Sequence, residues 1–167
     1  KRQTLGQRAV EAGLEPVAEA MMAGGSYREI ASDKTTDELS SVSEVLDGAK
    51  HIIAEWVADD PEIRKYVRQR ASRQGDVVVK KRRGADEDPN FENYYGFRKP
   101  ATGIEPHQVL AIRRGENEKK LSASLEVDDA SFLGWIRDHV DRPDDSAARS
   151  QVDAAIELMP APVFEDY

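Results

Sequence analysis

The sequence contains no cysteine, and this absence removes several kinds of site at once. Without thiols the chain has no disulfide, no Cys-ligated zinc or iron–sulfur cluster and no thiol nucleophile. With 167 residues it is long enough to bury one ordinary core or two small ones, so stability requires no cross-link. The composition therefore predicts a cytoplasmic protein held together by packing.

Long apolar runs are also missing. No stretch approaches the ~20 residues that a membrane-spanning helix needs, and no signal peptide opens the chain. The sequence starts at Lys1 without an initiator Met and ends on a Pro-rich, acidic stretch from Met159 to Tyr167. We therefore expect a piece of a larger protein that makes no contact with a membrane.

Motifs that carry catalysis are absent as well. There is no Gly-x-Ser-x-Gly elbow and no Gly-rich phosphate loop, and the three histidines form no two-His helix motif. Three acidic pairs occur, Asp59-Asp60, Asp128-Asp129 and Asp144-Asp145. Each pair precedes a predicted helix, where a carboxylate caps free amide groups, and capping explains the pairs better than two-metal chemistry. The sequence predicts no metal, no cofactor and no enzymatic activity.

Apolar residues at helical spacing dominate what the sequence does contain. The clearest helix starts with the capping pattern Ser41-Val42-Ser43-Glu44 and carries an apolar face that includes Ile52, Ile53 and Trp56. The other predicted helices lie between Thr4 and Ala23 with a break at Gly13, from Asp60-Pro61 to Gly75, at Pro106–Arg114, after Asp129, and after Asp145 or Ser146.

Short extended segments separate these helices. Val77–Val79 is β-branched and Leu121–Val127 alternates, so both should be strands, whereas Lys80–Asn90 is expected to be a charged loop. The densest aromatic group comprises Phe91, Tyr94, Tyr95 and Phe97. We expect packing from these rings, with base stacking as the alternative. The predicted fold class is mainly α, an irregular multi-helix assembly with one or two short β-strands.

The net charge of −8 hides an uneven distribution. Residues 61–83 hold nine Lys or Arg against two acidic residues, while residues 126–167 hold eleven acidic residues against three Arg. If the fold brings the basic residues together, they form a phosphate-binding surface. A solvated loop with Arg–Glu surface pairs is the alternative. The candidate nucleic-acid-binding residues are Lys80, Lys81, Arg82, Arg83, Arg113 and Arg114, with Lys119-Lys120 close to the last two.

Several separated segments follow one family pattern. They are Lys1-Arg2-Gln3-Thr4, Gly13-Leu14-Glu15-Pro16, the helix ending Ile52-Ile53-Ala54-Glu55, Asn93-Tyr94-Tyr95, and Leu110–Glu116 with its Arg114-Gly115-Glu116. In this order and spacing the chain resembles Tex, the bacterial transcription accessory protein family, from Lys1 to about Val127. Gln108 stands where the family has Arg, and Gln cannot supply a charged bidentate fork.

The resemblance implies part of a multidomain RNA-binding protein. Tex-like proteins have an N-terminal helical region, an RNase-H-like YqgF domain, helix-hairpin-helix motifs and a C-terminal OB-fold that binds RNA. Residues 1–127 are similar to the central helical region, and residues 128–167 to a helical extension leading toward the YqgF domain. The implied partners are RNA or DNA through the full-length protein, the remaining Tex-like domains in the same chain, and the transcription machinery. We expect a scaffold for the RNA-binding domains, with direct phosphate contact or a protein–protein interaction module as alternatives.

Overall fold

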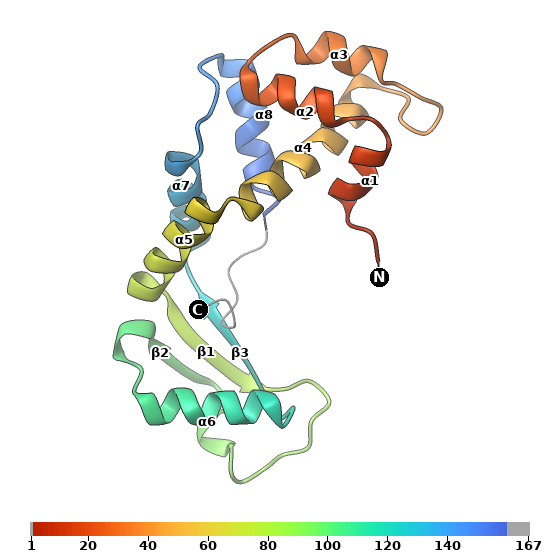
Figure 1. Ribbon diagram of the computed structural model, residues 1–167. Helices are drawn as coiled ribbons and strands as arrows, with labels where there is room; N and C mark the ends of the chain where they lie inside the picture. Colours follow the sequence, from red (N-terminus) through yellow and green to blue (C-terminus); the bar gives the residue numbers. More distant parts are fainter. Residues whose placement is uncertain (1, 160–167) are drawn as a thin grey trace. The chain divides into compact units, whose positions relative to one another are not determined.

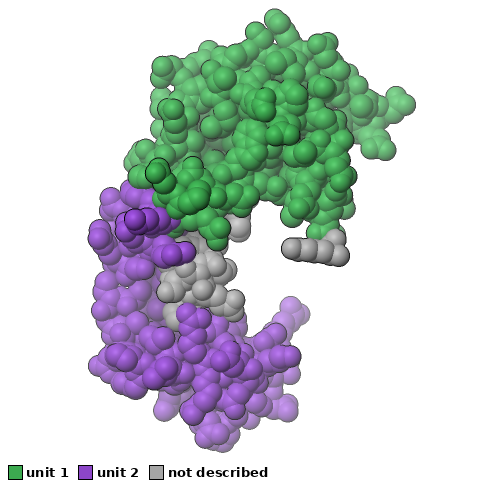
Figure 2. All heavy atoms as spheres, viewed as in Figure 1, with its two compact units in different colours: residues 1–64, 133–160 green, residues 65–132, 161–167 purple. Residues whose placement is uncertain are grey.

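The computed structural model describes residues 2–159 and divides into two compact units. Unit 1 comprises residues 1–64 and 133–160, and unit 2 comprises residues 65–132 and 161–167 (Figure 2). The chain crosses between the units within α5 (Pro61–Gln74) and within α7 (Asp129–His139). The described residues form eight α-helices and one three-stranded sheet, which confirms the predicted mainly α class.

Unit 1 is a group of helices packed around α4 (Val42–Asp59) (Figure 1). The helices that contact α4 are α1 (Leu5–Glu11), α2 (Glu15–Ala23), α3 (Tyr27–Asp33) and α8 (Ser146–Ile156). The core is apolar because α4 turns Val45, Ile52 and Ile53 inward at helical spacing, where each is at most 1% exposed. Burial of one such side chain contributes about 1.5–3 kcal/mol, so these contacts are the main source of stability.

The helix ends of unit 1 follow the predicted signals. Gly13, which follows the Ala12 cap of α1, and Gly24, the cap of α2, adopt left-handed φ angles of 81° and 75°, a conformation that glycine reaches without steric cost. Ser41 caps α4, since its Oγ accepts a hydrogen bond from the Glu44 amide at 3.2 Å. The Glu44 carboxylate accepts from the amide of Ser40 rather than from Ser41, so the predicted capping box closes one residue earlier.

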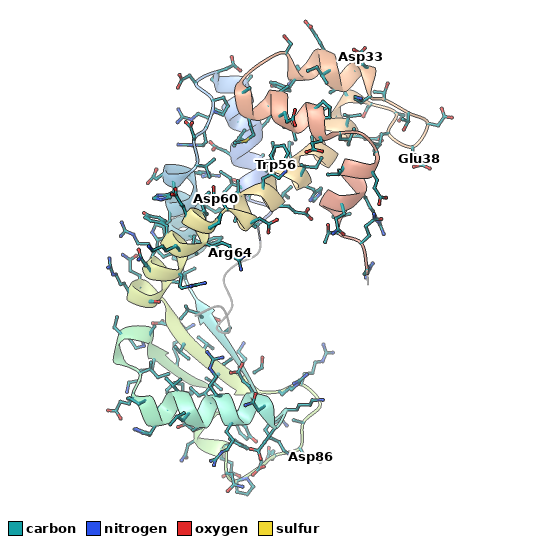
Figure 3. All side chains as sticks on the ribbon, in the orientation of Figure 1. Asp33, Glu38, Trp56, Asp60, Arg64 and Asp86 are labelled. Carbon is teal, nitrogen blue, oxygen red and sulfur yellow. The ribbon has the colours of Figure 1, made fainter. Side chains whose placement is uncertain are left out.

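Two features of unit 1 differ from the prediction. Helix α3 was not predicted, because among its seven residues only Tyr27 and Ala31 are buried and the apolar pattern is sparse. Trp56 was expected on the buried face of α4 but is 37% exposed (Figure 3). The indole ring is too large for the neighbouring helices to cover completely, as is usual for tryptophan.

Unit 2 is a small sheet with one helix against it. The strand order is β2-β1-β3, with β1 (Asp76–Lys81) antiparallel to both β2 (Phe97–Pro100) and β3 (Leu121–Glu126). Alternate residues of a strand share a face, so Val77 and Val79 lie on the same side of β1. They form a core with Ile112 of α6 (Pro106–Asn117) and the other buried members Ala71, Phe91, Leu121 and Leu125.

The segment between β1 and α6 is more regular than predicted. It contains two 3-10 helices, η1 (Glu92–Tyr94) and η2 (Ala101–Gly103), and the unpredicted strand β2. Phe91 is 2% exposed and the other three aromatic residues of the group pack against the same core, which confirms the packing prediction. Lys80 and Lys81 belong to β1 rather than to a loop, because β3 is long enough to pair with both.

Aspartates start α5, α7 and α8. Asp60 Oδ1 accepts from the amides of Glu62 and Ile63 at 2.9 and 3.3 Å, as predicted. Asp145 Oδ2 accepts from the Ala148 amide at 2.9 Å. The cap of α7 is Asp128, whose Oδ2 accepts from the Ser131 amide at 3.1 Å, so the prediction of Asp129 was wrong by one residue. One member of each acidic pair is therefore a helix cap.

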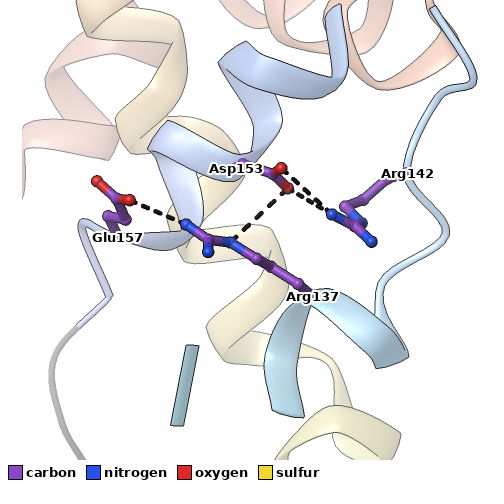
Figure 4. Close-up of polar contacts among 4 residues, drawn as sticks. All are labelled: Arg137, Arg142, Asp153 and Glu157. Atoms are coloured by element: carbon purple, nitrogen blue, oxygen red, sulfur yellow. Dashed lines mark hydrogen bonds and ion pairs between the residues drawn. The ribbon is translucent and has the colours of Figure 1, made fainter. Parts of the chain in front are cut away.

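A network of ion pairs ties α7 to α8 inside unit 1 (Figure 4). Asp153 accepts from Arg142 at 2.9 and 3.2 Å and lies 3.9 Å from Arg137 Nε. Arg137 also donates to Glu157 at 2.9 Å. The network is partly shielded from water, since the Arg142 side chain is 17% exposed. The Pro-rich stretch that follows Met159 lies outside the described residues.

Candidate nucleic-acid interface

The predicted basic residues at the end of β1 and directly after it lie beside a second basic segment. Lys80 lies opposite Ser122 and Lys81 opposite Leu121 in the antiparallel pair β1–β3. The Arg82 amide then donates to the carbonyl of Lys120 at 2.9 Å. Because the end of one antiparallel strand adjoins the start of the other, Lys119 and Lys120 lie beside the end of β1. We call the six residues Lys80–Arg83, Lys119 and Lys120 the basic end.

The turn between α6 and β3 holds the second segment in position. Lys119 adopts a left-handed φ of 60°, the amide of Lys120 donates to Gly115 at 2.8 Å, and the amide of Lys119 donates to Glu116 at 3.0 Å. This is the Schellman arrangement, in which the left-handed position usually holds glycine. Cations are favoured there because the last carbonyls of a helix carry partial negative charge.

Gly115 lets α6 approach β3 closely. A Cβ built at Gly115 would lie 2.4 Å from Leu121 Cδ1 and 2.6 Å from Leu121 Cγ. Both residues are buried, so no space exists for a side chain at this point. The close approach explains why a short turn suffices to bring the chain from the end of α6 to the first residue of β3.

Arg113 and Arg114 lie in the last turns of α6, in the same unit as the basic end. The Arg114 guanidinium lies 5.9 Å from the centre of the Phe91 ring, within cation–π range. Arg113 is partly buried and has an interaction within the chain. Both residues are therefore engaged with the protein itself, in contrast to the exposed Lys80–Arg83.

Arg98, which was not among the predicted site residues, differs from the cations of the basic end because it forms salt bridges within the sheet. Arg98 of β2 donates to Asp76 of β1 at 2.8 Å and also pairs with Glu126 of β3. These hydrogen bonds, the one to Asp76 first, raise the pKa of Arg98 above its ordinary value. Within residues 2–159 no ion pair involves any member of the basic end, so its charge is available to an external anion.

A small hollow adjoins the basic end. It is lined by Arg82, Glu116, Leu121, Ser122 and Ala123. The guanidinium and the hydroxyl are suitable donors to a phosphate, but the Glu116 carboxylate opposes an anion in the same hollow. The interior of the hollow is therefore unfavourable for a phosphate.

The other features considered in the sequence concern Gln108, metal ligands and membrane spans. Gln108, which replaces the family's Arg, accepts from the amide of Glu105 at 3.0 Å and from Lys99 Nζ at 3.3 Å, so it supports the start of α6. Among residues 2–159 no group of three or more His, Asp or Glu could hold a metal ion. None of the helices in that range is both long enough and apolar enough to cross a membrane.

Among residues 2–159, then, the six cations of the basic end form no ion pair, and clustered Lys and Arg are a feature typical of nucleic-acid-binding proteins. The family described as Tex central region-like matches residues 26–157, and the chain belongs to the Tex family. The predicted resemblance is thereby confirmed. The match spans the expected boundary at residue 127, and that boundary stays a prediction.

Individual relatives agree with this membership. The uncharacterized protein YdcI of Bacillus subtilis is 30% identical over 167 residues, which cover 94% of this chain and 23% of YdcI. The transcriptional accessory protein Tex of Neisseria gonorrhoeae is 29% identical over 128 residues, 75% of this chain and 17% of that protein. The human S1 RNA-binding domain-containing protein 1 is 29% identical over 153 residues, 84% of this chain and 15% of that protein. The chain spans less than a quarter of the length of these relatives.

Proposed function

We propose that this chain is a non-catalytic scaffold within a Tex-like transcription accessory protein that binds RNA in the cytoplasm. The names of the relatives, which refer to transcription and to RNA binding, support this role. The non-catalytic role is supported mainly by the acidic pairs, because one aspartate of each pair caps a helix. Asp60, Asp128 and Asp145 each accept backbone amides at a helix start, so the most conspicuous carboxylates in the sequence already have a structural role.

In this proposal unit 1 holds the remaining domains of the larger protein in position. Its core buries no polar or charged residue among those described, and ion pairs from Arg137 and Arg142 tie α7 and the segment after it to Asp153 of α8, so it is suited to act as a rigid support. Large apolar side chains stay exposed on its helices, 56% for Leu5, 43% for Val10 and 37% for Trp56. We propose that neighbouring domains pack on these exposed side chains and that residues 128–167 lead toward the YqgF-like domain.

Trp56 provides a direct test of the scaffold role. Replacing Trp135 by Phe leaves Trp56 as the only tryptophan of the chain, and acrylamide quenching then reports its exposure. The quenching constant should fall when the same chain is measured within a longer Tex-like protein in which every other tryptophan is also replaced by Phe. Amide hydrogen exchange across α8 should slow in the same comparison. Equal quenching and equal exchange in the two proteins would refute the scaffold role.

Direct contact with the phosphate backbone is a second candidate, favoured by the hydrogen bond between Arg82 and Lys120. That contact supports a single basic surface made from two distant segments, with Arg113 and Arg114 flanking it on α6. Fluorescence anisotropy of a labelled RNA at 50 mM salt tests this role. Replacing Lys80–Arg83 by Gln should weaken binding, and unchanged binding by that variant would remove these residues from the interface.

A further inference from the structure

Within the part of the chain that the structure describes, the basic end offers charge but no stacking surface. Unit 2 has six aromatic residues within its described part, and none of them is exposed. Phe91 and Phe132 are buried, and the Arg70 guanidinium lies 5.3 Å from the Tyr66 ring centre. Proteins that hold single strands usually combine a basic groove with aromatic rings on which bases stack.

The rings nearest the basic end are already engaged. Tyr94 and Phe97 pack against each other with ring centres 5.3 Å apart. The Tyr95 hydroxyl accepts a hydrogen bond from the Asp88 amide at 2.9 Å, and all three rings pack against the core of unit 2. Freeing any of them for a base would expose apolar core surface and break an internal contact.

The cations, in contrast, lie on a rigid frame, with Lys80–Arg83 and Lys119 exposed and Lys120 half-buried. Lys80 and Lys81 are held in β1 by pairing with β3, and Arg82 by its amide hydrogen bond to Lys120. Contacts from Lys and Arg to phosphates position a protein on nucleic acid, whereas sequence is read through base edges. An interface of this kind needs neither unstacked bases nor a particular sequence.

We infer that the basic end binds the sugar-phosphate backbone without reading or stacking bases, so that it binds both duplex and single-stranded nucleic acid. The inference rests on the direct-contact role proposed above and adds the class of ligand. Each phosphate neutralised on a duplex contributes about 0.9 to the slope of log affinity against log salt, and about 0.7 on a single strand. If all six cations engage a duplex, affinity should fall about 10³-fold between 50 and 200 mM salt.

The test uses the 167-residue chain and three labelled probes of equal phosphate number: single-stranded oligo-U RNA, duplex RNA and duplex DNA. Two variants remove charge from the two segments separately. One replaces Lys80–Arg83 by Gln, and the other combines Lys119→Asn with Lys120→Gln, since Asn tolerates the left-handed conformation at residue 119. A control that removes two positive charges, as the variant at residues 119 and 120 does, combines Arg8→Gln and Arg149→Gln at two exposed positions of unit 1.

The inference is supported if all three probes bind, if both variants show reduced salt slopes and if the control shows an unchanged slope. Binding of oligo-U with loss of both duplexes would overturn the inference but leave direct contact intact. Weaker binding in only one variant would overturn the single surface built from two segments. Absence of salt-sensitive binding to all three probes at 50 mM salt would overturn direct contact itself, leaving the scaffold role to be judged by Trp56.

Discussion

Replacing Gly115 by Ala tests whether the close approach of α6 to β3 determines the structure of unit 2. Glycine inside a helix costs roughly 1 kcal/mol relative to alanine, so without other contacts the substitution should stabilise α6. Here the new methyl group would lie 2.4 Å from Leu121 Cδ1 and 2.6 Å from Cγ. Real Cβ atoms are not found at such distances, so Leu121 or the helix must move.

The expected magnitude follows from two opposing effects. Leu121 is 1% exposed and its backbone is paired to Lys81, so it cannot turn away into solvent. Overpacking of such a core costs typically 1–3 kcal/mol. After subtraction of the ~1 kcal/mol gained in helix propensity, Gly115→Ala should destabilise unit 2 by about 1 kcal/mol.

The assay has to report on unit 2 alone, because two units need not unfold together. Native-state hydrogen exchange of the amides in α6 and β3 provides such a measurement. Gly134→Ala in α7 is the matched control, since a Cβ at Gly134 meets no atom within 4 Å. That substitution should instead stabilise its own helix by about 1 kcal/mol.

The two alanine substitutions therefore have opposite predicted signs. A second variant that combines Gly115→Ala with Leu121→Ala should cost less than the sum of the single changes, because removal of the leucine relieves the clash. If Gly115→Ala protects α6 and β3 as Gly134→Ala protects α7, steric contact with Leu121 does not explain the glycine. Such a result would mean that the turn before β3 is not tightly packed.

Three further predictions concern helix ends and ion pairs. Asp145→Ala should lower the free energy of unfolding of unit 1 by about 1 kcal/mol through loss of the α8 cap, measured by urea unfolding followed by tryptophan fluorescence. Lys119→Gly should stabilise α6 by about 1 kcal/mol because glycine adopts the left-handed conformation freely, measured by hydrogen exchange. Asp153→Asn should cost up to about 1 kcal/mol by weakening the pairs with Arg142 and Arg137, and 1 M NaCl should shrink the difference in urea unfolding.

The predicted helices of this protein agree with the structure where local signals are strong. Gly13, Ser41 and Asp60 act through their own backbone conformation or their own side chains, so the sequence contains the information needed to place them. Helix α3 and strand β2 depend instead on partners elsewhere. Strand β2 exists because β1 pairs with it, with Val78 opposite Arg98, and four residues carry too weak a pattern to reveal that.

The same distinction applies to the candidate interface. The sequence identifies Lys80–Arg83 as a basic run, but their relation to Lys119 and Lys120 depends on the register of β1 and β3. Arg98 lies in the same unit and carries the same charge, yet its salt bridges to Asp76 and Glu126 occupy it. Composition could not separate the paired arginine from the unpaired cations, because pairing is a property of the fold.

Net charge is therefore a poor guide to what this chain binds. The acidic residues that offset its basic residues are partly committed within unit 1, Asp145 to an amide and Asp153 to two arginines. At physiological salt, charges interact appreciably only within about 8 Å, so a paired carboxylate elsewhere does little to neutralise an exposed lysine. The local surplus at the basic end, rather than the total of −8, should then govern contact with a phosphate backbone.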